Sequence, residues 1–280
     1  MEISLLTLNL HSYQQHVCDC PFSTMHQHER EVQIIAEAIA QLGIGVVCFQ
    51  EVGEYMHDPI ANPYGESPSN MAFRICSRLR HWKHWYHIYQ DWSHIGFHRW
   101  REGTAIMSRY PLAHNYSAYV SADQRKDSHL SRKVTLSCID VPEFGLLHIA
   151  NVHLSRAEHG FVAEYATLME LARSRSRFGS RGELLVGDFN APAGQDAYNH
   201  VVGNAAYVDQ FYEAHPDRFL EPSCYGRIDG WEDAPARRID YVFKRSGDPM
   251  RIQAMDVIFD GSSHPVVSDH FGYVARFALY

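Results

Sequence analysis

Short apolar runs recur along the chain and alternate with stretches that are rich in polar residues. Most runs consist of Val, Ile, Leu and aromatic residues, which is typical of strands in a buried sheet. We therefore predict strands at Ile3–Leu8, Gly45–Phe49, Gly103–Ser108, Val134–Ile139, Leu146–Val152, Glu183–Gly187, Ile239–Phe243, Met255–Phe259 and Phe271–Leu279.

Three further segments carry apolar residues at helical spacing. They are marked by Val32, Ile35, Ile39 and Leu42, by Met71, Ile75 and Leu79, and by Val162, Tyr165, Leu168 and Leu171. Gly43 follows the first segment, where a glycine commonly ends a helix. The chain shows no repeat and no low-complexity linker, and strands and helices interleave too unevenly for a doubly wound sheet or a barrel. We expect one α/β domain with a mixed sheet arrangement, spanning residues 1–280.

Composition and charge narrow the class of protein. Apolar residues make up 45% of the 280 positions and charged residues 21%, which excludes intrinsic disorder. The net charge of −8 argues against a protein held to nucleic acid by bulk charge. No apolar run is long enough to cross a membrane, the first residues lack a basic leader, and six cysteines are too sparse for a disulfide scaffold. These features lead us to expect a cytoplasmic protein. The 19 histidines are unusually many.

Polar residues that could take part in catalysis or metal binding stand where the apolar runs end. They occur in Leu8-Asn9, Gln50-Glu51, Val152-His153, Gly187-Asp188-Phe189-Asn190, Ile239-Asp240 and Ser268-Asp269-His270. Any one of these is more often a solvated turn than a site, but six in order predict a cluster at one rim of the sheets. Gathered carboxylates require a cation, and hard oxygen ligands suit Mg²⁺ or Mn²⁺. A histidine held by a second carboxylate can act as a general base.

These motifs, in this order, resemble the endonuclease/exonuclease/phosphatase superfamily. The similarity spans residues 7 to 270, and Gly187-Asp188-Phe189-Asn190 with Ser268-Asp269-His270 carries most of its specificity. The resemblance implies a four-layered α/β sandwich with two mixed β-sheets flanked by helices. It also implies metal-dependent cleavage of a phosphoester.

The same resemblance implies a role for each matching residue. Glu51, Asn9 and Asp269 would hold the metal ion, and His270 would be the general base, oriented by Asp240. Asp188 and Asn190 would hold the attacking water or the phosphate, and His153 would donate to a phosphate oxygen or act as an acid. Glu102, in Arg101-Glu102-Gly103-Thr104, would support His153, and Arg132 would lie near the phosphate.

The superfamily contains nucleases, sugar and inositol phosphatases and sphingomyelinases, so the motifs alone leave the substrate open. Residues 81–100, HWKHWYHIYQDWSHIGFHRW, hold four of the five tryptophans, including Trp92 beside His94. Such aromatic faces suit a sugar ring, would equally stack a nucleobase, or could simply cover the core as the edge of a strand or helix. The sequence around Asn9, Trp92, Glu102 and His270 is similar to that of the bacterial branch that contains maltose 6'-phosphate phosphatase.

We therefore expect a Mg²⁺-dependent phosphomonoesterase that acts on a sugar phosphate or a similar small metabolite, with Trp92 and His94 contacting the substrate. No stable nucleic-acid partner and no membrane partner are expected. The rival hypotheses are a nuclease or other phosphodiesterase and an inactive binding module on the same fold. The segment from His11 to His28 contains Cys18-Asp19-Cys20 among four histidines. A zinc site there is the minor hypothesis, because the spacing matches no standard zinc site, and an ordinary loop near the active-site rim is the favoured interpretation.

Overall fold

The strands of the protein form two six-stranded sheets. A computed structural model describes residues 1–12, 28–58, 67–176, 179–226 and 235–280. The first sheet has the order β11 (Met250–Ile258), β12 (Gly272–Leu279), β1 (Glu2–Asn9), β2 (Val46–Tyr55), β4 (Trp100–Ser108) and β3 (His87–Gly96). The second has the order β5 (Leu112–Tyr119), β6 (Lys133–Val141), β7 (Gly145–His153), β8 (Gly182–Asp188), β10 (Asp240–Arg245) and β9 (Tyr207–Asp209).

Both sheets are mixed. The pairs β1–β2 and β7–β8 are parallel, and the remaining neighbours are antiparallel. The two sheets pack face to face over a core that includes Leu5, Val46, Ile149 and Val186. This apolar interior explains why the central strands appear in the sequence as continuous apolar runs.

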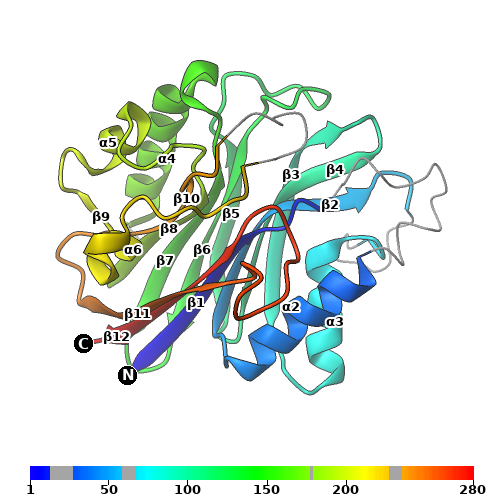
Figure 1. The fold of residues 1–280 in the computed structure, drawn as a ribbon, viewed down its shortest axis with the longest axis horizontal. Helices are drawn as coiled ribbons and strands as arrows, with labels where there is room; N and C mark the ends of the chain where they lie inside the picture. Colours follow the sequence, from blue (N-terminus) through cyan, green and yellow to red (C-terminus); the bar gives the residue numbers. More distant parts are fainter. Residues whose placement is uncertain (13–27, 59–66, 177–178, 227–234) are drawn as a thin grey trace.

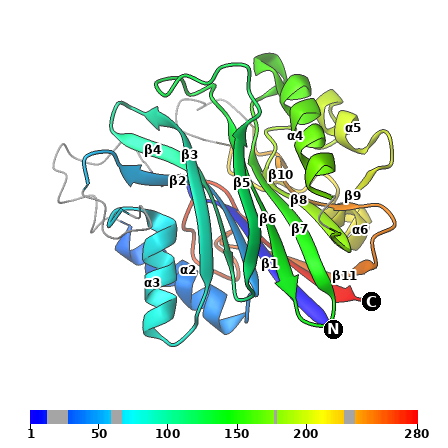
Figure 2. The same ribbon diagram turned by 180° about the vertical axis from the view of Figure 1, so that it is seen from behind.

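Helices cover the outer face of each sheet (Figures 1 and 2). α2 (Glu29–Gln41) and α3 (Met71–His81) pack on the first sheet, and α4 (Phe161–Ser176) and α5 (Asp196–Val202) pack on the second. The short helices α6 (Gln210–Ala214), η1 (Ala157–His159) and η2 (Pro216–Arg218) complete the elements of the described residues. The expected four-layered sandwich is confirmed. None of the described helices combines the length and the apolar character that crossing a bilayer requires.

Two of the three predicted helices show local signals at one end. In α2, Val32, Ile35 and Ile39 lie on the buried face, and Gly43 follows the helix with a φ of 64°, which is the conformation that glycine tolerates best. α3 begins at the cap residue Asn70, whose side chain accepts a hydrogen bond from the backbone N–H of Phe73.

The strands that the sequence pattern did not predict, β3, β5 and β9, are all at sheet edges. Half-exposed residues alternate irregularly along β3 and β5, and β9 has only three residues. An edge strand buries less apolar surface, so its sequence carries a weaker pattern. The aromatic segment at residues 81–100 thus contains the end of α3, the whole of β3 and the first residue of β4.

The topology gathers the polar strand ends at one rim of the sandwich. The parallel strands β1, β7 and β8 end at Asn9, His153 and Asp188. The antiparallel strand β10 begins at Asp240, and β12 begins just after His270. Strands that run in opposite directions therefore place their opposite ends at the same rim.

Candidate active site

The side chain of Asn9 joins the two sheets at this rim. Its amide Nδ2 donates to Glu51 Oε1 at 2.9 Å and to Asp188 Oδ2 at 3.1 Å. All three residues are buried. One amide thus brings a carboxylate of each sheet into the same small volume, as the order of motifs predicts.

Glu51 owes its position to an irregularity in β2. Gln50 and Glu51 lie opposite Thr104 alone, because the register of β2 against β4 shifts between Phe49 and Val52. Glu51 has a φ of 49°, an unfavourable conformation for a residue with a side chain. A bulge of this kind redirects a side chain, and here it turns Glu51 into the site. Ser12 holds the distorted backbone by donating from Oγ to the carbonyl of Glu51 at 2.7 Å.

A buried pair of amides supports the floor of the site. Gln50 Nε2 donates to Asn151 Oδ1 at 2.7 Å, and Asn151 Nδ2 donates to the carbonyls of Phe49 and Ala105 at 2.9 Å each. The two residues stand on different sheets, so their hydrogen bond links the two sheets beneath the candidate site. Buried amides that are satisfied in this way rigidify their surroundings.

His270 forms a hydrogen-bonded pair with Asp240. The distance from His270 Nδ1 to Asp240 Oδ2 is 2.8 Å, and Ser223 Oγ donates to the same oxygen at 2.6 Å. Burial disfavours the charged imidazole, but Asp240, Asp188 and Asp269 raise the pKa of His270 well above its usual value. The other ring nitrogen, Nε2, faces Asp188 Oδ2 at 4.0 Å. The ring is therefore oriented by Asp240 with Nε2 toward the centre of the site.

A second histidine, His153, also has a carboxylate at its Nδ1. His153 Nδ1 lies 3.4 Å from Glu102 Oε1, and His94 Nε2 lies 3.1 Å from Glu102 Oε2. Burial favours the neutral acid, but His94 and His153 lower the pKa of Glu102 well below its usual value, so Glu102 is a carboxylate. His153 Nε2 then faces Glu51 at 3.7 Å and Asp188 at 3.8 Å.

These carboxylates and histidines form two neighbouring groups that could hold a metal ion, Glu51 with Glu102 and His153, and Asp188 with Asp240 and His270. Oδ2 of Asp269 is buried and accepts no hydrogen bond from any residue that the structure describes. His11 Nδ1 lies 3.2 Å from Glu51 and 3.7 Å from the same Asp269 oxygen.

Burial alone would lower the pKa of His11, but Glu51 and Asp269 raise it to about 9. The site thus has surplus negative charge and hard oxygen donors, which fit a divalent cation.

The other predicted residues lie around this centre. The backbone N–H of Asn190 donates to Asp188 Oδ1 at 2.8 Å, and its side chain donates to the carbonyl of Leu154 at 2.9 Å. Arg132 Nη1 lies 3.2 Å from His153 Nδ1 and 3.8 Å from Glu102. Trp92 lies on the edge strand β3, where its ring contacts the side chains of Arg101 and Lys126.

The structure places His94 against Glu102, and its contact with the substrate stays a prediction. Its ring is buried, with Nδ1 3.0 Å from Ser93 Oγ and Nε2 beside the Glu102 carboxylate. Its contact with His153 is therefore indirect and passes through Glu102.

Two residues of the site were not assigned from the sequence. His11 follows Asn9 by two positions, so the strand end itself was the available signal. Ser223 lies in a loop and gave no signal before folding brought it to Asp240.

Most of the cysteine and histidine segment, residues 13–27, lies outside the described residues, and the zinc hypothesis there remains a prediction.

Known structures share this architecture. An endonuclease/exonuclease/phosphatase family protein from Leptotrichia buccalis has a TM-score of 0.81 at 22% identity, over 99% of this chain and 100% of that protein. A mannosyl-6-phosphatase from Bacteroides thetaiotaomicron has a TM-score of 0.69 at 15% identity, over 99% and 100%. The catalytic domain of human Nocturnin has a TM-score of 0.69 at 16% identity, over 100% and 94%. At these identities the likeness shows the fold.

The family itself is shown by sequence. No curated protein matches the chain. However, the model of the endonuclease/exonuclease/phosphatase family matches residues 6–270, nearly the whole chain. Members of this family are metal-dependent phosphoester hydrolases. The protein therefore belongs to the endonuclease/exonuclease/phosphatase family and is a metal-dependent phosphoester hydrolase.

Proposed function

We propose that the protein is a Mg²⁺-dependent phosphomonoesterase that acts on a sugar phosphate or a similar small phosphorylated metabolite, with residues 1–280 as one catalytic domain. The observation that carries the proposal is the pair of oriented histidines. His270 and His153 each have a carboxylate at Nδ1, and both direct Nε2 toward Asp188. Two oriented imidazoles around a carboxylate cluster suit hydrolysis of a phosphoester.

These positions support the roles that we propose for the residues. His270, held by Asp240, would accept a proton from the attacking water once a bound cation offsets the charge of the carboxylates that raise its pKa. Asp188 and Asn190 position that water or the phosphate, and Asp188 is well suited to this because it is hydrogen-bonded by Asn9 and by the backbone of Asn190. His153, whose Nδ1 is turned to Glu102, donates from Nε2 to a phosphate oxygen. Arg132 lies beside His153 and contributes positive charge for the phosphate.

Glu51, Asn9 and Asp269, with His11 alongside, are the residues that would hold the metal ion. Carboxylate and amide oxygens favour Mg²⁺ or Mn²⁺. When bound, the ion supplies positive charge that neutralises the phosphate and the developing negative charge of the transition state.

A small substrate is supported by the surroundings of the site. A cavity of about 400 Å³ adjoins Asn190, within the range of about 300–1,000 Å³ that small-molecule sites occupy. A mannosyl-6-phosphatase is among the proteins that share the fold. The net charge of −8 also disfavours tight binding of a nucleic acid.

A phosphodiesterase, including a nuclease, is the second candidate. One observation favours it: Arg101 and Lys126 both lie near the Trp92 ring, with distances of 5.8 Å and 5.4 Å from its centroid to their charged groups. An aromatic ring with cations nearby is a suitable platform for a base and its phosphate. An inactive binding module is disfavoured, because the two histidine–carboxylate pairs and the Asn9 contacts are all formed.

Phosphate release from a panel of sugar phosphates in Mg²⁺, beside nicking of plasmid DNA and digestion of an oligonucleotide, tests the proposal. We expect phosphate release that Asp188→Ala and His270→Ala abolish without unfolding the protein. His81→Ala, at the end of α3 and exposed, is the matched control and should retain activity. Efficient DNA cleavage with no release from any sugar phosphate would overturn it. Full activity of either active-site variant would show that the centre is misplaced.

A further inference from the structure

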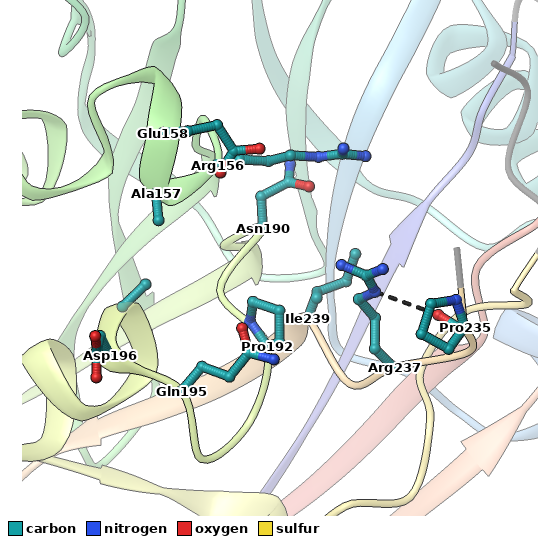
Figure 3. A pocket seen from close by; sticks show the side chains of 11 residues that line it. Arg156, Ala157, Glu158, Asn190, Pro192, Gln195, Asp196, Pro235, Arg237 and Ile239 are labelled. Carbon is teal, nitrogen blue, oxygen red and sulfur yellow. Dashed lines mark hydrogen bonds between the residues drawn. The ribbon is translucent and has the colours of Figure 1, made fainter. Parts of the chain in front are cut away.

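The cavity beside the proposed catalytic residues has arginines in its wall. Its lining includes Arg156, Asn190, Pro192, Arg237 and Ile239 (Figure 3). Asn190 and Ile239 connect it to the centre, because Asn190 donates to Asp188 and Ile239 directly precedes Asp240. A ligand that occupied this cavity would therefore lie next to the reacting phosphate.

Two arginines dominate one side of this cavity. Figure 3 shows the guanidinium groups of Arg156 and Arg237 on the same side as the Asn190 amide, whereas the carboxylate of Asp196 lies on the far side. Arg237 Nε donates to the carbonyl of Pro235 at 3.2 Å, which orients its guanidinium. Glu158, also in the lining, is exposed to water, which weakens its attraction for Arg156 but does not remove it.

The electrostatics of Arg156 agree with this arrangement. Burial lowers the pKa of Arg156, Glu158 and Asp188 raise it, and Arg237 and Arg132 lower it. Like charges repel one another, and an anion between the two arginines would offset that repulsion. Arg132 belongs to the phosphate side of the catalytic centre, so Arg156 stands between that centre and Arg237.

We propose that this cavity binds a second phosphate group of the substrate, so that the preferred substrates are small bisphosphorylated metabolites. The inference rests on the proposed phosphomonoesterase function and specifies its substrate class. Arginine binds phosphate through two parallel N–H donors, and two arginines with an amide form a suitable receptor. The first phosphate would lie at the His270 and His153 centre, and the second between Arg156 and Arg237.

Matched substrates that differ only in the second phosphate test the proposal. We would measure kcat/KM in Mg²⁺ for glucose 6-phosphate against glucose 1,6-bisphosphate, for fructose 6-phosphate against fructose 1,6-bisphosphate, and for AMP against adenosine 3',5'-bisphosphate. The wild-type protein should prefer the bisphosphate of at least one pair by about tenfold or more, the effect of one charge-assisted contact. Arg237→Gln and Arg156→Gln should each reduce that preference by about tenfold, mainly through KM.

Arg251→Gln, an exposed arginine of β11, is the matched control and should keep the preference. Equal kcat/KM values within every pair, or a preference that survives Arg237→Gln, would overturn the subsite.

A binding measurement separates failure of the subsite from failure of the proposed function. If the wild-type protein releases no phosphate from any compound, the phosphomonoesterase proposal fails. Calorimetric titration of the same compounds in EDTA then tests anion binding in the cavity independently of catalysis. Tighter binding of a bisphosphate by the wild-type protein than by Arg237→Gln supports the anion site, and equal binding overturns it.

Discussion

The amide of Asn9 donates to the carboxylate of Asp188 at 3.1 Å, although the two residues are 179 positions apart in the chain. The same amide donates to Glu51, so it separates two buried carboxylates that would otherwise face each other directly. Two carboxylates in one buried site cannot both remain charged without compensation. Asn9 is thus placed to stabilise the charged form of both.

Replacing Asn9 with alanine should lower activity and weaken the response to Mg²⁺. The loss of both hydrogen bonds leaves the carboxylates mispositioned, and changes that disturb metal ligands typically cost about 10–100-fold. Phosphate release measured against Mg²⁺ concentration gives both quantities. Asn115→Ala, an exposed position on β5, serves as the control. Unchanged kcat and Mg²⁺ dependence in Asn9→Ala would remove Asn9 from the site.

Glu102→Gln should lower kcat by about 10–100-fold with little change in KM, because the carboxylate orients the His153 ring through Nδ1 and so directs Nε2 toward the phosphate. Glu183→Gln is a close control. Glu183 is also a buried carboxylate near a histidine nitrogen, that of His148 at 3.3 Å, but it stands at the other end of β8 from Asp188. The Glu183→Gln variant should lose stability and keep its activity.

Variants of His94 distinguish two possible roles of this residue. If His94 acts through Glu102, His94→Ala lowers kcat, and adding it to Glu102→Gln has little further effect, because coupled residues are not additive. If His94 contacts the substrate, as the sequence suggested, KM rises and the two effects add. Steady-state kinetics of the two single variants and the double variant distinguish these outcomes.

Mg²⁺ should stabilise the folded protein against heat. A ligand that binds only the native state contributes about 2.7 kcal/mol at 100 times its Kd. The melting temperature in excess Mg²⁺ should therefore exceed that in EDTA, and Glu51→Gln should abolish most of the difference. Glu54→Gln removes a buried carboxylate of the same strand that pairs with Arg101, and should retain the shift. A shift of equal size in Glu51→Gln would place the ion elsewhere.

Gly187→Ala should destabilise the fold by about 3 kcal/mol or more. Gly187 has a φ of 131°, and a Cβ there would lie 2.2 Å from the carbonyl oxygen of Val152 on the neighbouring strand. Gly247 also has a positive φ, of 79°, but a Cβ there meets nothing within 4 Å, so Gly247→Ala should cost only about 1 kcal/mol. Urea unfolding of both variants checks the difference, and equal losses would contradict the steric explanation.

The sequence by itself determined the central strands and the chemistry of the rim. β1, β2 and β8 are buried on both faces, so their apolar runs are continuous and the polar residues that end them stand out. Asn9, Asp188 and Asp240 could be found this way, because the direction of each strand places its polar end at the same rim.

The tertiary structure decided what depends on edges, loops and long-range contacts. The edge strands β3, β5 and β9 escaped prediction because half-exposed surfaces carry no regular apolar pattern. In the sequence His94 lies near Trp92, and only the pairing of β3 with β4 brings its side chain to Glu102. Arg156 and Arg237 lie on separate loops, 81 positions apart, and no spacing in the sequence indicates that one cavity receives both. Local pattern records burial, whereas the meeting of distant side chains depends on how the two sheets pack.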